Sequence, residues 1–223
     1  MSSSSDPEIC VELPGVRLGA CRADDVRVEL VVPDLAREMD AVCDRLRRTM
    51  TVEQVAQLDS VRAVRAMFRT WGMDPSKYRP SSEALLRRVA QGRGLYRISN
   101  VVDIINLCSI ETGWPYGLYD LAHVQPPVSF RLGQAGEAYE GIGKQTWHLH
   151  GRPVMVDAQG PFGSPISDST RTMITESARS VLTVVFAPAA TRDSVLQQAL
   201  DTLVNRFRQF APAQAVETWF VTF

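Results

Sequence analysis

The stretch that most constrains the fold is "VVDIINLCSIETGWPYGLYD", residues 101–120. Its first part places apolar side chains at the spacing of one buried helix face: Val101, Ile104, Ile105 and Cys108. The same helix carries Asp103 and Asn106, three residues apart on a neighbouring face. A buried polar side chain needs a hydrogen-bond partner, so these two residues indicate either structural bonds or the wall of a pocket.

The composition is that of a globular protein rather than a membrane or disordered one. The chain has 223 residues, of which 45% are hydrophobic and 22% charged. No window approaches the roughly 20 uninterrupted apolar residues of a membrane helix. The opening "MSSSSDPE" lacks the pattern of an export signal. We therefore expect a cytoplasmic protein with a disordered tail over residues 1–8 and a single domain over residues 9–223.

The cysteines and histidines do not form a metal-binding pattern. The four cysteines are scattered without Cys-x-x-Cys spacing, which favours buried free thiols over a zinc site or a disulfide framework. His148 and His150 would share one face of a strand, as a metal pair requires, but the third histidine, His123, lies in a different segment. No carboxylate pattern completes a ligand set, so we expect no metal and no cofactor.

Basic residues concentrate in the middle of the chain. Residues 1–34 carry 3 Lys and Arg against 7 Asp and Glu, a net charge of −4. Residues 35–100 carry 13 against 7, a net charge of +6, and residues 101–223 carry 8 against 11, a net charge of −3. The basic third indicates either contacts with the phosphates of an anionic partner or a solvated helix surface with internal ion pairs.

The periodicity predicts an α+β fold. Helices are expected over residues 34–48, capped by Asp34, over residues 51–71, over residues 81–91, capped by Ser81 or Ser82, and over residues 191–210. Early strands are expected at 16–21 and 26–33, and later ones at 128–132, 146–150, 152–160, 180–188 and 217–223. We expect helices mainly in the first half and a mixed sheet in the second.

The segment "SDSTRTMITES", residues 167–177, is rich in hydroxyl groups, and Asp168 is its second residue. Ser, Thr and Asp often satisfy backbone groups at helix caps and turns, and that structural role is one interpretation. The other is a polar wall for a binding site. The residues of this segment alone do not decide between them.

Four segments together resemble the B3/B4 domain of the phenylalanyl-tRNA synthetase beta subunit. They are "YRPSSEALLRRV", "NVVDIINLCSIETGWPYGLYDL", "GRPVMVDAQG" and "DSTRTMITESARSVLTVVF", in the order of that domain and with roughly its spacing. The resemblance covers about residues 77–187 and is strongest over 100–120. The matching motif positions are Asn100, Val102, Asp103, Asn106, Gly113, Pro115, Tyr119 and Asp120.

The resemblance implies a free-standing B3/B4-like domain: a mixed sheet flanked by helices, with an added helical amino-terminal segment and a carboxy-terminal helix and strand. In the synthetase this domain is the editing module, which hydrolyses tyrosine wrongly esterified to the phenylalanine tRNA. By analogy, Asn106 would line the aminoacyl pocket, because an amide can hydrogen-bond the polar atoms of a substrate. Asp103 would be a structural acid that holds a backbone turn.

The other expected site residues follow from a mechanistic hypothesis built on this analogy and from the charge pattern. Catalysis would rest on Asn106, Asp168, Ser169 and Thr172, which orient substrate and water while backbone amides stabilise the oxyanion. Substrate would contact Asn100, Trp114, Tyr116, Gly117 and Tyr119, the aromatic residues forming the rim of the pocket. The tRNA acceptor end would meet the basic third of the chain at Arg62, Arg65, Arg69, Arg87, Arg88 and Arg93.

The chain departs from the family pattern in two places. The family histidine after the helix is replaced by Gly117, and a later family glutamate has no acid in register, Asp168 being the nearest carboxylate. Three functions remain open: an aminoacyl-tRNA deacylase, a tRNA-dependent aminoacyl transferase in which an amine replaces water, and a non-catalytic module that binds a tRNA or an amino acid. The oligomeric state does not follow from the sequence.

Overall fold

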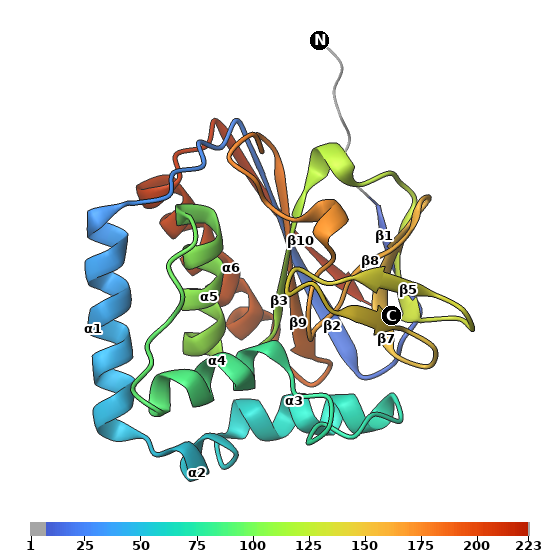
Figure 1. The fold of residues 1–223 in the computed structure, drawn as a ribbon, viewed down its shortest axis with the longest axis horizontal. Coiled ribbons are helices and arrows are strands. Elements are labelled where there is room, and N and C mark those ends of the chain that lie inside the picture. Colours follow the sequence, from blue (N-terminus) through green and yellow to red (C-terminus); the bar gives the residue numbers. More distant parts are fainter. Residues whose placement is uncertain (1–7, 223) are drawn as a thin grey trace.

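The computed structural model describes residues 8–222. The expected disordered tail over residues 1–8 lies outside this range except for Glu8, which is exposed. The described chain forms an α+β fold with three layers: helices, a central sheet and a smaller second sheet (Figure 1).

The central sheet is antiparallel and has the order β10-β2-β9-β3. Its strands are β2 (Val16–Asp24), β3 (Tyr116–Asp120), β9 (Val181–Pro188) and β10 (Ala215–Thr222). Five of the six α-helices of the described chain end before residue 113, as expected, and β2, from the start of the chain, pairs in the middle of this sheet. Strand β3, which follows the helix of the opening motif, lies at the sheet edge.

The second sheet packs on one face of the central sheet and has the order β1-β4-β7-β8. Its strands are β1 (Ile9–Val11), β4 (Val128–Leu132), β7 (Pro153–Asp157) and β8 (Gly160–Gly163), and a separate hairpin joins β5 (Ala138–Glu140) to β6 (Thr146–His148). Aromatic pairs fill the space between the two sheets. The ring centroids of Phe130 and Phe186 are 5.1 Å apart, and those of Tyr119 and Phe162 are 4.8 Å apart.

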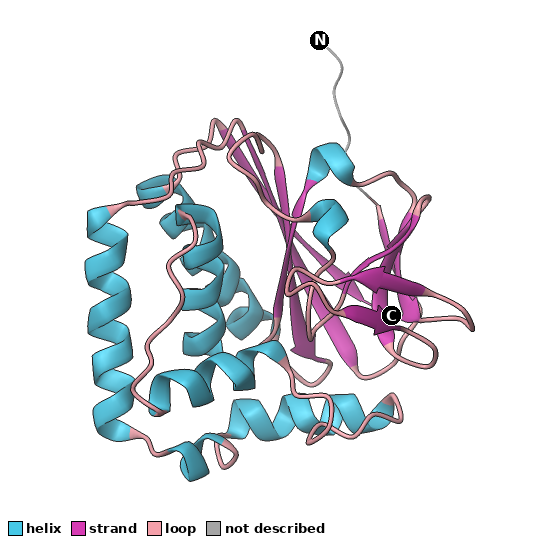
Figure 2. Ribbon diagram, viewed as in Figure 1, coloured by secondary structure: helices cyan, strands magenta, loops and turns pink. Residues whose placement is uncertain are grey.

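Most of the helices lie on the other face of the central sheet, and the helix Asp59–Thr70 runs below both sheets in this view (Figure 2). The helices are α1 (Pro33–Thr49), α2 (Val52–Val55), α3 (Asp59–Thr70), α4 (Ser81–Ala90), α5 (Asn100–Thr112) and α6 (Asp193–Phe210). Helix α6 approaches β2 closely at Gly19, where an added Cβ would lie 3.1 Å from Leu196 and 3.3 Å from Leu200. Within residues 8–222, no helix is long and apolar enough to cross a membrane.

Several expected element boundaries are wrong for identifiable backbone reasons. Residues 26–33 form no strand, because Asp25 adopts a left-handed φ of 55° that ends β2. The single helix expected over 51–71 is two helices, because Leu58 takes an extended ψ of 134° and the chain starts again at Asp59. Thr51 caps the short α2 with a capping box.

The expected helix caps also differ from the structure. Helix α1 begins at Pro33, with Val32 at the N-cap, so Asp34 lies in the first turn instead of capping it. Helix α4 has Pro80 at its N-cap and no side-chain cap from Ser81 or Ser82. Both starts use the fixed φ of proline, which suits a helix amino terminus without a capping hydroxyl.

The core helix of the opening motif is confirmed as α5. Ser99 caps its start by accepting a hydrogen bond from the Val102 amide at 3.5 Å. Gly113 ends it with a left-handed φ of 73°, and a Cβ there would lie 2.2 Å from the Ser60 hydroxyl oxygen. Asp103 accepts from the Ile98 amide at 3.0 Å, which is the turn-holding role expected of it.

All four cysteines are free thiols. Cys21 and Cys108 are buried, as expected, whereas Cys10 is exposed and Cys43 is half-buried. Cys10 lies on β1, where its side chain points away from the core that Ile9 and Val11 enter, since successive side chains of a strand alternate between faces.

A buried carboxylate joins α3 to α4. Glu83 is fully buried, and its two oxygens accept from Arg65 at 2.8 Å each and from Arg87 at 2.9 Å. Burial alone would raise the pKa of Glu83, but the hydrogen bonds from the two arginines outweigh it and hold the pKa below its ordinary value. The helix pair therefore depends on an ionised Glu83.

Replacing Glu83 with glutamine will leave two arginines facing a neutral buried amide. We expect Glu83→Gln to lower the free energy of unfolding by about 2–4 kcal/mol, measured by urea denaturation at pH 7. A carboxyl group whose pKa is lower in the folded than in the unfolded protein stabilises the fold at pH values above its unfolded pKa. The difference in the free energy of unfolding between wild type and Glu83→Gln should therefore shrink as the pH falls below about 4.5. Glu176→Gln, at an exposed position, is the matched control and should change little. An equal effect of both variants would contradict this role.

Candidate active site

A cavity of about 200 Å³ lies beside the free edge of β3, between α5 and the loop of residues 164–174. We call it the Asp168 cavity, and its walls are formed by Ser81, Val102, Ile105, Asn106, Tyr116, Leu118, Ile142, Ser164, Ile166, Ser167, Asp168 and Ile174. At about 30 Å³ per water, it holds roughly six or seven water molecules, a space on the scale of one amino-acid side chain. The cavity brings together three expected site residues: Asn106, Tyr116 and Asp168.

The two asparagines of α5 have different roles. The Asn100 side chain is buried, and it uses its full hydrogen-bonding capacity on backbone groups of Arg27, Glu29, Val101 and Phe210. The expected substrate contact at Asn100 is therefore wrong. Asn106 is half-buried, and its side-chain amide makes no hydrogen bond to any residue in the range 8–222. Its donors and acceptor are available inside the cavity.

Asp168 closes the edge of β3 with its carboxylate. One oxygen accepts from the Leu118 amide at 3.2 Å, and the other accepts from the Ser164 amide at 3.3 Å. Burial of the carboxylate among protein atoms raises its pKa to about 7, against the lowering effect of these two hydrogen bonds. A carboxyl group with this pKa can exchange a proton near neutral pH, as a general acid or base must.

The Tyr119 side chain occupies the space beside Gly117, the residue that replaces the family histidine. Its ring is fully buried between two glycines: a Cβ at Gly117 would lie 2.1 Å from the Tyr119 hydroxyl oxygen, and one at Gly163 would lie 2.3 Å from the ring. The hydroxyl lies near Asp168 without the geometry of a hydrogen bond. The expected place of Tyr119 on the pocket rim is wrong, because its strand turns it toward Phe162 and the second sheet.

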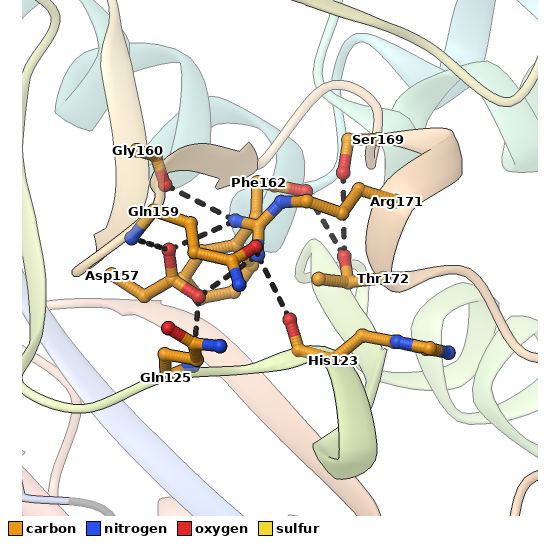
Figure 3. Close-up of polar contacts among 9 residues, drawn as sticks. All are labelled: His123, Gln125, Asp157, Gln159, Gly160, Phe162, Ser169, Arg171 and Thr172. Atoms are coloured by element: carbon orange, nitrogen blue, oxygen red, sulfur yellow. Dashed lines mark hydrogen bonds and ion pairs between the residues drawn. The ribbon is translucent and has the colours of Figure 1, made fainter.

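A buried ion pair anchors the loop that carries Asp168 (Figure 3). The guanidinium of Arg171 forms two hydrogen bonds with the Asp157 carboxylate, at 2.9 and 3.0 Å, and Asp157 is fully buried on β7. The same guanidinium donates to the carbonyl oxygens of His123 at 2.8 Å and Gly160 at 3.2 Å. A bidentate pair with these extra bonds fixes the segment that follows Asp168.

Ser169 and Thr172 face each other instead of the cavity. Both are buried, with their hydroxyl oxygens 3.4 Å apart, and the Thr172 hydroxyl donates to the Phe162 carbonyl at 3.3 Å (Figure 3). Neither lines the Asp168 cavity. The structure therefore does not place them where they would orient a substrate or a water, because their hydroxyl groups bond each other and the Phe162 carbonyl inside the protein.

The remaining expected aromatic contacts divide between two cavities. Tyr116 lines the Asp168 cavity, whereas Trp114 lines a separate space beside α6. Ser164, by contrast, was not singled out from the sequence, although it borders the cavity and its amide binds Asp168. No sequence motif marked Ser164, because its role arises from a loop that folds back onto β3.

The six expected tRNA contacts are only partly available. Arg65 and Arg87 bind Glu83, and Arg88 stacks on the Tyr96 ring with 3.8 Å between the guanidinium and the ring centroid. The exposed arginines of the set are Arg62, Arg69 and Arg93, of which Arg62 hydrogen-bonds Gln57. Part of the basic surface therefore serves the helical layer, as the structural interpretation of the charge pattern predicts. In residues 8–222 no cluster of three or more metal-ligating side chains occurs.

The glycine at position 117 is required by the buried Tyr119 ring. We expect Gly117→Ala to lower the free energy of unfolding by about 1–3 kcal/mol, because the new methyl group overlaps the Tyr119 hydroxyl. Tyr119→Phe removes the nearest overlapping atom, so the double variant should lose less stability than the sum of the singles in urea denaturation. Gly143→Ala, which meets no atom within 4 Å, is the control. Additive losses would refute the contact.

The raised pKa of Asp168 predicts that the free energy of unfolding depends on pH. Between about pH 4 and about pH 7 the folded carboxyl keeps its proton while the unfolded one loses it, so wild-type stability falls as pH rises through this window. The free energy of unfolding of wild type relative to Asp168→Asn should decrease by at most about 4 kcal/mol from pH 4 to pH 7. Urea titrations at five pH values test this, and a difference that does not vary with pH would contradict the raised pKa.

The chain is similar to known proteins over most of this region. The sequence model of the B3/4 domain matches residues 63–214, a wider range than the motifs at 77–187. The phenylalanine–tRNA ligase beta subunit of Synechococcus sp. (strain JA-3-3Ab) is 31% identical over 143 residues, covering 56% of this chain and 16% of that protein. The same subunit of Synechococcus sp. (strain CC9605) is 31% identical over 166 residues, covering 66% and 20%.

A solved structure shows a weaker likeness. It is an N-terminal fragment of the phenylalanyl-tRNA synthetase beta-subunit from Pyrococcus horikoshii, 13% identical, with a TM-score of 0.45 over 95% of this chain and 50% of that one. The chain spans 16% to 20% of the two Synechococcus subunits it matches. Because the B3/4 domain model covers more than half of the sequence, this chain belongs to the B3/4 domain family.

Proposed function

We propose that this protein is an aminoacyl-tRNA deacylase that uses the Asp168 cavity to hydrolyse the ester of a mischarged or unusual aminoacyl-tRNA. The observation that carries the proposal is the shared cavity of Asn106 and Asp168: a free amide and a carboxyl group with a pKa of about 7, in a space of about 200 Å³. An amide supplies hydrogen-bond donors for a carbonyl oxygen, and such a carboxylate can accept a proton from water.

The reaction requires few groups, because an aminoacyl ester is already activated. The oxygen of a water attacks the ester carbonyl carbon while the ionised Asp168 accepts the proton of that water. The Asn106 amide donates to the carbonyl oxygen, which becomes negatively charged in the tetrahedral intermediate. The bond to the ribose oxygen then breaks, and Asp168 returns the proton to this leaving oxygen. Free amino acid and intact tRNA are the products.

Two further features support a tRNA ester as the substrate. The relatives that match this chain are beta subunits of a tRNA ligase, and the family match includes both Asn106 and Asp168. The exposed guanidiniums of Arg69 and Arg93 are available for phosphates, and Arg62 would exchange its surface hydrogen bond to Gln57 for a phosphate contact. The apolar walls of the cavity, including Ile105 and Leu118, suit the side chain of the amino acid.

The proposal is tested by incubating a panel of correctly and incorrectly charged tRNAs with the purified protein. We expect release of free amino acid from one or a few species, with a rate that rises with pH up to about pH 7 as Asp168 ionises. Asp168→Asn should lower the rate at least about 100-fold, and Asn106→Ala about 10-fold to 100-fold. Asp201→Asn, at an exposed position on α6, should retain the wild-type rate.

The other two functions give different results in the same assay. A transferase would remove the aminoacyl group from the tRNA only when a small amine is added, and the product would be an amide of the amino acid instead of free amino acid. A binding module would retain charged tRNA on a filter without turnover, and the retention would fall in Asn106→Ala. Survival of every charged tRNA at high protein concentration, with no amide product, would overturn the deacylase proposal. Unchanged rates in both Asn106 and Asp168 variants would overturn the assigned residues.

A further inference from the structure

A second cavity, of about 460 Å³, lies between the carboxy-terminal half of α5 and residues 195–206 of α6. We call it the α5–α6 cavity, and its walls are formed by Cys108, Glu111, Thr112, Trp114, Tyr116, Val195, Gln198, Ala199, Thr202 and Arg206. Its volume is in the range of small-molecule sites, and it combines aromatic and apolar walls with a few polar groups. It shares only Tyr116 with the Asp168 cavity, and the proposed deacylation assigns it no role.

One residue that lines this cavity carries an unpartnered polar group. The Tyr116 hydroxyl makes no hydrogen bond to the described residues, although only 7% of the residue is exposed. It lies near Thr112 and within the electrostatic influence of Cys108, Arg206 and Glu111. Buried hydroxyl groups in proteins are normally paired, so an unpaired one on a residue that lines this cavity offers a hydrogen-bonding position to a polar ligand group.

The polar walls offer more acceptors than donors. Arg206 is buried and commits four of its five N–H groups: two to Glu38, at 2.7 and 3.0 Å, one to Glu111 at 2.6 Å and one to the Cys108 sulfur at 3.3 Å. The second oxygen of Glu111 accepts no hydrogen bond; its partner is the exposed guanidinium of Arg45, in an ion pair at 3.8 Å that is beyond hydrogen-bond distance.

The hydroxyl groups of the cavity add to the acceptors. Thr202 donates its proton to the Gln198 carbonyl at 2.9 Å, which leaves its lone pairs open. The carboxylates of Glu38 and Glu111 share the buried guanidinium of Arg206, and the second cation paired with Glu111, Arg45, is exposed and lies outside the cavity walls. Trp114 and Tyr116 provide aromatic surface, which attracts organic cations.

We propose that the α5–α6 cavity binds a small organic ammonium ion with an apolar body. The ammonium group donates to the open oxygen of Glu111, to Thr202 and to the Tyr116 hydroxyl, and the apolar body packs against Trp114 and Ala199. A carboxylate ligand of the same shape is rejected, because Glu111 repels it and Arg206 has one free N–H at most to offer. The proposal does not depend on deacylation by the Asp168 cavity.

The test uses isothermal titration calorimetry of the full chain with three probes of similar shape: 2-phenylethylamine, 2-phenylethanol and 3-phenylpropionate. We expect 2-phenylethylamine to bind with a Kd of about 1 mM or tighter, and the other two at least about tenfold more weakly. Glu111→Gln should weaken amine binding at least about tenfold, whereas Asp201→Asn on the outer surface of α6 should leave it unchanged.

Glu111→Gln also removes one partner of Arg206, so its folding is checked by circular dichroism and thermal denaturation. If it does not fold, Thr202→Val decides, because it removes an acceptor without changing charge and should weaken amine binding several-fold. Equal affinities for the amine and the carboxylate, or no binding of the amine at about 10 mM, would overturn the proposal. So would amine binding that both the Glu111 and Thr202 variants leave intact.

Discussion

The free edge of β3 is the constraint on which the candidate site depends. An edge strand presents unpaired backbone groups, and they must be satisfied by something other than another strand. Here the Asp168 carboxylate accepts from the Leu118 amide and ties the loop of residues 164–174 to the edge. The cavity lies between this loop and α5, so the same contact that completes the sheet also creates the pocket and buries its carboxyl group.

The arrangement has a cost, because a buried carboxyl group with a pKa of about 7 destabilises the fold at neutral pH. Other interactions must therefore hold the loop. The bidentate pair of Arg171 and Asp157 does so a few residues away, with additional bonds to two backbone carbonyls. Tyr119 fills the space behind Asp168, which requires glycine at positions 117 and 163. The Arg171–Asp157 pair and the packing of Tyr119 therefore stabilise the loop against the destabilising burial of Asp168.

Local patterns predicted the elements that local forces form. The apolar spacing of residues 101–108 correctly predicted a buried helix, because helix periodicity is a property of neighbouring residues. Residues 26–33 have strand composition and form none, since one left-handed residue, Asp25, redirects the chain. The helix expected over 51–71 breaks at Leu58 although its apolar spacing continues. A change in the backbone conformation of one residue can end a helix or strand without changing the spacing of apolar residues, so the sequence pattern does not reveal it.

The sequence by itself determined the fold class, the core helix and the family, because these rest on periodicity and on motifs that extend over many residues. It also placed Asn106 and Asp168 among the residues to examine. Only the tertiary structure decided which polar side chains lack a hydrogen-bond partner within the protein. Asn100 and Asn106 lie on one helix, yet the first is bound to the carbonyl of Phe210, 110 residues away, and the second faces a cavity. The hydrogen-bond partners of a buried group come from distant segments, so only packing assigns them.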